Sequence, residues 1–146
     1  MASIADPPFV STNFTYFKPD DLVKMTTSIP AKLARVDDRI GIIAPGMYAD
    51  LLVLSRRPNT PTPYHSIVIS TPADVKLVMV GGSPIYGDYD VLQQVVPPAN
   101  VYPLTVCGVQ KGINLNGFNE GWPAILKKLE SELARYGIAP STFECD

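Results

Sequence analysis

The stretch from residue 26 to residue 54 reads TTSIPAKLARVDDRIGIIAPGMYADLLVL and holds the strongest pattern in the chain. A short helical run leads through an acidic turn to Pro45 and Gly46, Asp50 follows, and the apolar run 51–54 ends the stretch. Proline fixes the backbone of a turn position, and glycine supplies the positive φ angle that many turns require. The pattern therefore predicts a helix, a tight turn and a buried strand, in that order.

Helical signals precede this stretch and extend into it. A Pro-Asp-Asp sequence at residues 19–21 begins a predicted helix that runs to about Ser28, with its acidic residues where the helix dipole favours negative charge. Pro30 interrupts the helix, and residues 31–35 predict a second helical segment of one or two turns. Residues 1–18 show no clear periodicity and are interpreted as an extended arm.

Short apolar runs with period two follow, and they predict strands. The candidates are Leu51–Leu54, Ser66–Ser70, Val75–Val80, Pro84–Gly87 and Val101–Val106. Gly81 and Gly82 lie between two of these runs and indicate a hairpin, because adjacent glycines suit the primed turns of two-residue loops. Residues 108–118 are predicted to form a loop.

The last third of the chain contains an amphipathic helix at about residues 122–136. Its apolar side chains follow helical spacing on one face: Trp122, Ile125, Leu126, Leu129, Leu133 and Tyr136. Asn119 is a candidate cap, Pro123 suits the first turn, and Gly137 ends the helix. The separate strand and helix signals predict an α+β fold with a small β-sheet or sandwich.

Three segments follow from these signals: an arm at residues 1–18, a β-domain with leading helices at 19–106, and a C-terminal extension at 107–146. The composition is that of a globular protein, with 46% hydrophobic and 18% charged residues. A formal charge of −2 argues against nucleic-acid binding. Apolar runs all fall short of the roughly 20 residues needed to cross a bilayer, so no membrane partner is expected either.

The residues of the opening stretch resemble the end of the catalytic barrel and the start of the C-terminal β-domain in metal-dependent amidohydrolases. The matching positions are Thr27, Pro30, Ala31, Gly41, Ile43, Pro45, Gly46, Ala49, Asp50, Leu51, Val53 and Leu54. Residues 74–82 with Ile85 and Tyr86 resemble the closing hairpin of the same domain, so the resemblance covers about residues 19–88. Ile29 departs from the family, which usually has asparagine at that position.

The resemblance implies hydrolysis by metal-activated water, with ligands that include a His-x-His pair in the barrel. The chain has a single histidine, whereas a catalytic zinc site normally needs three protein ligands. At 146 residues it is also too short for a complete barrel of typically ~250 residues. We therefore expect a non-catalytic C-terminal part of an amidohydrolase with a structural role, whose zinc or similar metal belongs to the barrel.

An alternative is a free-standing binding module that reuses this β-domain. Its candidate surface consists of the aromatic residues Phe14, Tyr16, Phe17, Tyr86 and Tyr89. Such aromatics more often form core or dimer contacts than ligand surfaces. No catalytic, cofactor-binding or metal-binding residue is predicted in either case.

Several polar residues suggest chemistry at first sight, but each has a simpler interpretation. His65 is predicted at the surface or edge of a strand, without partner ligands. Asp50 is expected to accept backbone amide hydrogen bonds in its turn instead of binding a metal. The acidic pairs Asp37-Asp38 and Asp88-Tyr89-Asp90 lack the spacing of a calcium loop and are interpreted as solvated turns.

The two cysteines, Cys107 and Cys145, leave three alternatives: a disulfide, two inert thiols, or a catalytic or metal-binding role. A disulfide would imply an exported protein. The family's β-domain includes further strands from the N-terminus of the whole enzyme, so at least one sheet edge is expected to lack a partner. Because exposed edges pair with other chains, we expect a homodimer or a contact with the missing barrel.

Overall fold

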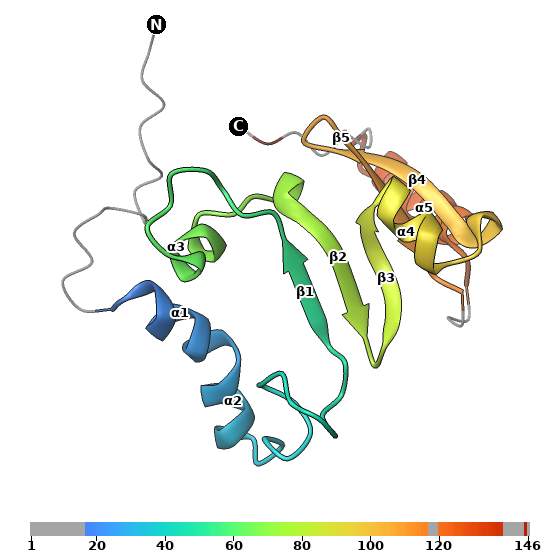
Figure 1. Ribbon diagram of the computed structural model, residues 1–146. Helices are drawn as coiled ribbons and strands as arrows, with labels where there is room; N and C mark the ends of the chain where they lie inside the picture. Colours follow the sequence, from blue (N-terminus) through green and yellow to red (C-terminus); the bar gives the residue numbers. More distant parts are fainter. Residues whose placement is uncertain (1–16, 117–119, 139–144, 146) are drawn as a thin grey trace, which may run out of the picture. The chain divides into compact units, whose positions relative to one another are not determined.

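The computed structural model describes residues 17–116, 120–138 and 145 (Figure 1). The candidate cap Asn119 and two of the candidate aromatics, Phe14 and Tyr16, lie outside these residues. The chain divides into two compact units, one from residues 1–48 and 56–70 and the other from residues 49–55 and 71–146. The two units are described separately.

The first unit is helical and contains α1 (Pro19–Thr26), α2 (Ser28–Leu33) and α3 (Pro63–Val68). The Asp21 side chain accepts a hydrogen bond from the backbone N–H of Lys18 (3.1 Å), which caps the start of α1 as the acidic first turn predicts. The chain breaks between α1 and α2 at Thr27, with φ −126° and ψ −90°. The predicted interruption therefore exists but precedes Pro30, which lies within α2.

The predicted strand at residues 66–70 is wrong, because helix α3 occupies this region. The hydroxyl of Thr62 accepts a hydrogen bond from the backbone N–H of His65 (3.2 Å), and the first residue of α3 is a proline. These two features start a helix and outweigh the β-branched residues that follow. Ser66 is buried at 3% exposure, and its hydroxyl accepts a hydrogen bond from the backbone N–H of Arg57 (2.7 Å).

The second unit is built on a single five-stranded antiparallel sheet. Its strands are β1 (Leu51–Leu54), β2 (Val75–Val80), β3 (Ser83–Asp88), β4 (Val101–Val106) and β5 (Val109–Asn114). They lie in the order β1-β2-β3-β5-β4, so β5 inserts between β3 and β4. This arrangement confirms the α+β fold and four of the predicted strands, and it is one sheet instead of a sandwich.

The predicted hairpin is confirmed: β2 and β3 are joined by Gly81 and Gly82, with φ angles of 56° and 81°. The predicted loop at residues 108–118 is wrong, because β5 pairs with β4 along its whole length. The turn between β4 and β5 consists of Cys107 and Gly108, both with positive φ. Only its second residue is a glycine, so this hairpin has a weaker sequence signal than the first.

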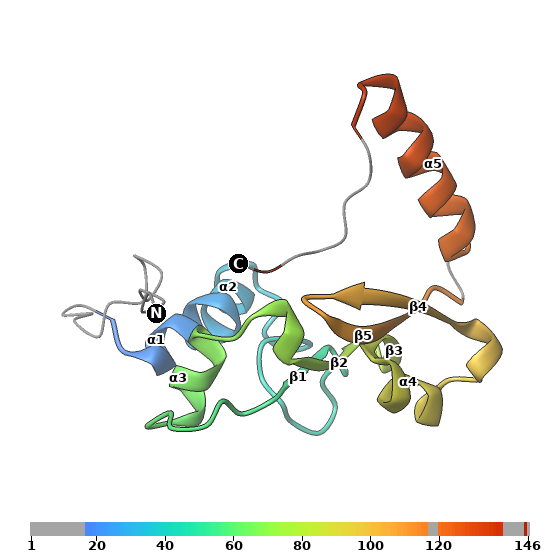
Figure 2. The same cartoon turned by 90° about the horizontal axis from the view of Figure 1, so that it is seen from above.

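Helix α4 (Tyr89–Val95) was not predicted, and it forms the core of the second unit. Figure 2 shows α4 beside the strands of this unit. The helix packs on the sheet through Leu92, which is completely buried and contacts the buried residues Val96 and Val101. Gly112 of β5 permits this close contact. A Cβ atom at that position would lie 2.7 Å from Cγ1 of Val101 and 3.1 Å from Cδ2 of Leu92.

Two short 3₁₀ turns, η1 (Pro72–Asp74) and η2 (Pro98–Asn100), precede β2 and β4. The C-terminal helix α5 (Trp122–Arg135) confirms the predicted amphipathic helix, and Gly137 follows it with a φ of 70°. None of the described residues of α5 is buried. The described helices include none that is long and apolar enough to cross a membrane.

Candidate functional site

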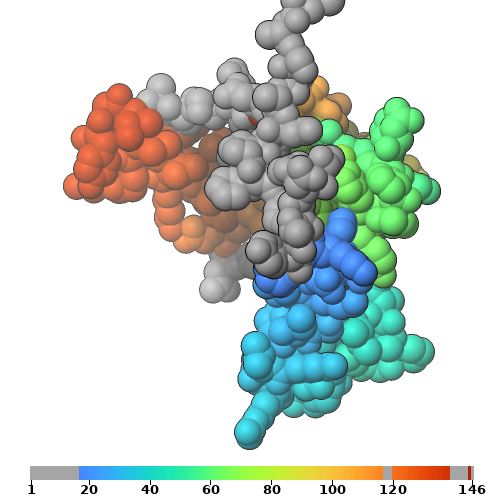
Figure 3. Space-filling view, turned by 90° about the vertical axis from the view of Figure 1, so that its left-hand side faces the viewer, coloured from blue at the N-terminus to red at the C-terminus, as the bar shows by residue number. Residues whose placement is uncertain are grey.

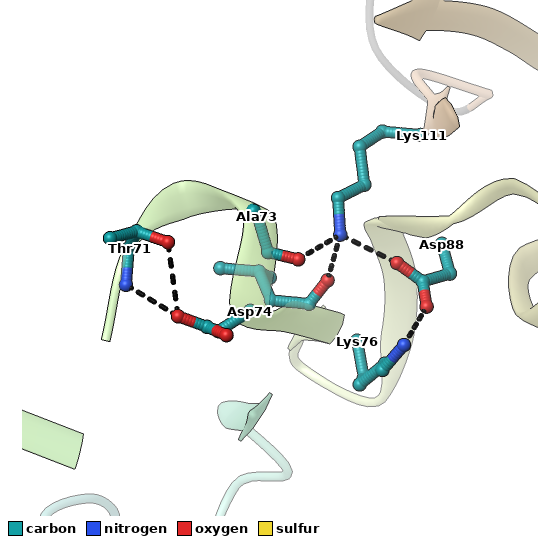
Figure 4. Close-up of polar contacts among 7 residues, drawn as sticks. Thr71, Ala73, Asp74, Lys76, Asp88 and Lys111 are labelled. Atoms are coloured by element: carbon teal, nitrogen blue, oxygen red, sulfur yellow. Dashed lines mark hydrogen bonds and ion pairs between the residues drawn. The ribbon is translucent and has the colours of Figure 1, made fainter. Parts of the chain in front are cut away.

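A cluster of polar contacts inside the second unit centres on Lys111 of β5 (Figure 4). The side chain of Lys111 is completely buried. Its Nζ donates hydrogen bonds to the carbonyl oxygens of Ala73 (2.8 Å) and Val75 (2.6 Å) and to Oδ1 of Asp88 (2.5 Å). An ammonium group has three donor hydrogens, and this site supplies three acceptors. The side chain is therefore fully satisfied.

The 3₁₀ turn η1 presents one of these carbonyl groups. The carboxylate of Asp74 accepts hydrogen bonds from the backbone N–H (2.8 Å) and the hydroxyl (3.0 Å) of Thr71. This side-chain cap closes the turn in which Ala73 lies. The Thr71–Asp74 cap thus fixes the turn whose Ala73 carbonyl oxygen accepts a hydrogen bond from Lys111, which lies 38 residues further along the chain.

Asp88 joins two lysines, because its second carboxylate oxygen also accepts a hydrogen bond from Lys76. Burial alone would raise the pKa of the Asp88 carboxyl, but the hydrogen bonds and charges of Lys111 and Lys76 outweigh burial and hold it below its ordinary value. The hydrogen bond to Asp88, followed by the charge of that carboxylate, raises the pKa of Lys76. The side chain of Lys76 is 44% exposed, so water screens its ion pair with Asp88.

This cluster has the chemistry of a structural ion pair. A lysine that acts as a base or nucleophile needs a free electron pair and access to a substrate, whereas Lys111 is enclosed and donates all its hydrogens. The interpretation of Asp88 as part of a solvated turn is wrong, because its residue is only 7% exposed. Asp90, by contrast, is exposed in the first turn of α4.

The turn residues of the opening stretch have local structural contacts. A backbone hydrogen bond from Met47 to Ala44 (3.2 Å) closes a turn with Pro45 and Gly46 at its centre, and the φ of Gly46 is 87°. Proline followed by a glycine with positive φ is typical of a type II turn. Asp50 accepts a hydrogen bond at Oδ1 from the backbone N–H of Gly81 (2.6 Å), in a different turn from its own.

Asp50 therefore fastens the β2–β3 hairpin to the start of β1. A second bond, from the N–H of Gly82 to the carbonyl of Ala49 (3.0 Å), lies beside it. Together they fix the tip of the hairpin against the residues that precede the edge strand. Sequence reasoning expected a backbone amide as the partner of Asp50 but could not identify which turn provides it.

His65 lies on helix α3 and not at a strand start, and its Nδ1 is buried without a hydrogen-bond partner. Asp37 and Asp38 lie in the turn region after α2, where Asp38 is 3.6 Å from Nε of Arg39. Within the part of the chain that the structure describes, no three His, Cys, Asp or Glu side chains are grouped as metal ligands.

Cys107 and Cys145 are joined in the second unit, with their Cα atoms 5.0 Å apart. Cys107 occupies the first position of the β4–β5 turn, and Cys145 is exposed. The two cysteines are separated by 38 residues in the sequence, and helix α5 lies between them. The third alternative, a metal site at these cysteines, has no further ligand group among the described residues.

A model of the amidohydrolase family matches residues 7–85, which is more than half of the chain. The chain belongs to the amidohydrolase family. Comparisons with curated proteins and with solved structures found no match.

The family match covers the helices α1 to α3 and the strands β1 and β2, and it ends within β3. The amidohydrolase motif residues Pro45, Gly46 and Asp50 thus have the turn and hairpin contacts described above. Lys111 and Asp88 lie beyond the matched residues. Lys111 was missed and Asp88 was misinterpreted as a turn residue, because the two are 23 residues apart and a buried ion pair between distant residues leaves no periodic signal in a sequence.

The described aromatic residues that were considered for a binding surface belong to two different units of the chain. Tyr89 packs against the core around Leu92. Tyr86 is partly buried, and burial, followed by the charge of Asp88, raises its pKa. Phe17 is 46% exposed and belongs to the helical unit.

Proposed function

We propose that this chain is a scaffold region of an amidohydrolase: the end of its catalytic barrel together with its C-terminal β-domain. In this role it supports the barrel and performs no hydrolysis by itself. The C–N bond hydrolysis of the whole enzyme would take place at a metal held by barrel residues outside this chain. The family match over residues 7–85 supports the origin of the chain.

The main support for this proposal is the exposed apolar surface of the helical unit. Ala31 is its one fully buried hydrophobic residue among those described. Large apolar side chains of the same unit are exposed, and they are Phe17, Met25, Ile29, Leu33, Ile42, Ile43, Tyr48, Tyr64 and Ile67. The surface formed by α1 and α2 is seen in blue in Figure 3.

Such a surface fits a region that is covered in the whole enzyme. Burial of one large apolar side chain contributes about 1.5–3 kcal/mol, so exposing many of them forgoes much of the stabilisation that a folded unit normally gains. Leu33 is 82% exposed and Ile43 is 90% exposed. Many exposed apolar side chains in one small unit are consistent with an interaction surface. The proposed barrel supplies the apolar partner that this unit lacks.

The donor groups of the chain do not fit a catalytic zinc site. The full sequence has one histidine, and His65 lies on a short helix without a group of acidic or cysteine neighbours among the described residues. Zinc hydrolases typically use three protein ligands and leave one position open for water. No catalytic step is therefore assigned to residues of this chain.

Metal content and hydrolysis by the purified chain test the non-catalytic part of the proposal. The chain is equilibrated with zinc, freed of unbound metal, and assayed for bound zinc and for hydrolysis of a panel of amides and cyclic amides. His65→Ala serves as the matched control, since His65 is the one histidine of this chain. We expect neither stoichiometric zinc nor a difference between the two proteins. One zinc per chain, with hydrolysis that His65→Ala abolishes, would overturn the proposal.

A further inference from the structure

We propose that the bond between Cys107 and Cys145 is a reducible latch: it holds the α5 arm (residues 120–138 of the described chain) to the tip of the β4–β5 hairpin. Reduction frees one end of the arm and leaves the five-stranded sheet intact. The arm lies outside the segment that matches the amidohydrolase family. The latch is therefore independent of the proposed scaffold function.

The position of Cys107 separates the latch from the sheet. It lies in the two-residue turn between the paired residues Val106 and Val109, so its side chain is attached outside the strand ladder. Its φ of 50° and the φ of 72° at Gly108 are those of a tight primed turn. Breaking the sulfur–sulfur bond removes no backbone hydrogen bond of β4 or β5.

The sheet has stabilising contacts that do not involve the arm. The Lys111 cluster joins β5 to the start of β2 and to the end of β3. Leu92 of α4 packs with Val96 and Val101 on the face of the sheet. These contacts connect every strand from β2 to β4 and persist when the cysteines are separated.

The arm has few such contacts. None of the described residues of α5 is buried, and its ion pairs join neighbours within the arm, Lys128 with Glu120 and Arg135 with Glu132. An isolated helix of about this length is marginally stable in water. Because α5 has 14 residues, we expect it to depend on its two points of attachment: the chain that follows β5 and the bond at Cys145.

The bond is accessible to reductants, since Cys145 is exposed and Cys107 is partly exposed. A thiolate of a small dithiol attacks one sulfur, the other cysteine leaves as a thiolate, and a mixed disulfide forms. The second thiol of the reagent then releases the first cysteine and closes the reagent's own cyclic disulfide. Two electrons pass from the dithiol to the protein, which ends with two free thiols.

Hydrogen exchange measured by mass spectrometry tests the latch on the full chain, with and without dithiothreitol. Closing a loop with a separation of 38 residues removes considerable conformational entropy, so we expect amide exchange in α5 to rise at least about tenfold on reduction. Exchange in β4 and β5 should stay the same. Alkylation without reductant should label neither cysteine.

Two variants distinguish the latch from effects on the turn. Cys145→Ser removes the bond from the far end, and Cys107→Asn removes it while keeping a residue that tolerates positive φ before Gly108. Both should show the fast exchange of α5 without any reductant. The proposal is overturned if α5 exchanges equally in all states, if β4 and β5 lose protection together with α5, or if both thiols react in unreduced protein.

Discussion

At the residue scale, Lys111 connects the C-terminal part of the chain to the part that matches the amidohydrolase family. It comes from β5, beyond the family match, and reaches the backbone around η1 and the start of β2, within it. Removing one partner of a buried ion pair usually costs far more than the pair contributes, because a buried charge is left without compensation. This lysine is therefore expected to be essential for the stability of the sheet.

Lys111→Met should lower the free energy of unfolding by about 3–5 kcal/mol, since Asp88 and two carbonyl groups lose their buried partner. Urea denaturation followed by circular dichroism measures this change. Lys128→Met is the matched control, because Lys128 forms an ion pair with Glu120 but is 68% exposed. Lys128→Met should lower the free energy of unfolding by no more than about 1 kcal/mol. An equal loss of unfolding free energy in the two variants would show that the buried ion pair is no more important for stability than the exposed one.

The depressed pKa of Asp88 gives a pH dependence of definite sign. A carboxyl group whose pKa is lower in the folded state binds fewer protons there, so it stabilises the fold above the unfolded-state pKa. That contribution is present above the ordinary value of 3.8 and is lost as the pH falls through the lower folded-state pKa.

Unfolding free energies measured from pH 7 down to pH 2 check this sign against Asp88→Asn, which cannot titrate. At pH 7 the wild-type protein should have the larger free energy of unfolding. This difference from the variant should disappear below about pH 4, where carboxyl groups take up protons. If the free energies of unfolding of the two proteins change in parallel with pH over this range, the protonation of Asp88 is not linked to folding.

At the element scale, the sequence predicted the elements whose signals are local. The β2–β3 hairpin has two adjacent glycines, and α5 has a regular apolar stripe with a proline and a glycine at its ends. Helix α3 was mistaken for a strand because its β-branched residues outweighed the Thr62 cap in the sequence interpretation. Elements α4 and β5 were missed because their short patterns gain stability from packing around Leu92 and Gly112.

The hydrogen bond between the Gly81 amide and Asp50 connects the β2–β3 hairpin to the start of β1, and its contribution can be measured. Asp50→Ala removes the acceptor for the Gly81 amide and should reduce the free energy of unfolding by about 1 kcal/mol. Asp50→Asn keeps an oxygen at the same position and should lose less than half of that amount. Thermal and urea denaturation of the two variants compare them directly. If alanine and asparagine behave alike, the hydrogen bond does not contribute.

At the scale of the whole molecule, the two edges of the sheet differ in how open they are to a partner. Among the described strands, β1 and β4 pair on one side only. Strand β4 contains Pro103, which lacks the N–H that a further strand would use. Strand β1 has four apolar residues and no proline, and Leu52 and Val53 are exposed. The β1 edge is therefore the better template for another chain.

The isolated chain should form a homodimer through β1 when no barrel is present. Light scattering over a wide dilution series should give twice the monomer mass of 15.9 kDa at high concentration. Leu52→Lys places a charge on the open edge and should shift the protein to monomer. Thr105→Lys makes the same kind of change on β4 and should leave the dimer in place. A monomer at all concentrations, or equal effects of both variants, would contradict this assignment.

The intact mass of the native polypeptide that carries this sequence tests the scaffold proposal most directly. The polypeptide can be recovered from its source cells with an antibody against α5 and weighed by mass spectrometry. A barrel of typically about 250 residues would add roughly 27 kDa, so we predict a chain of at least about 40 kDa that binds zinc or a similar divalent metal. A native polypeptide of 15.9 kDa, the mass of these 146 residues alone, would contradict the proposal.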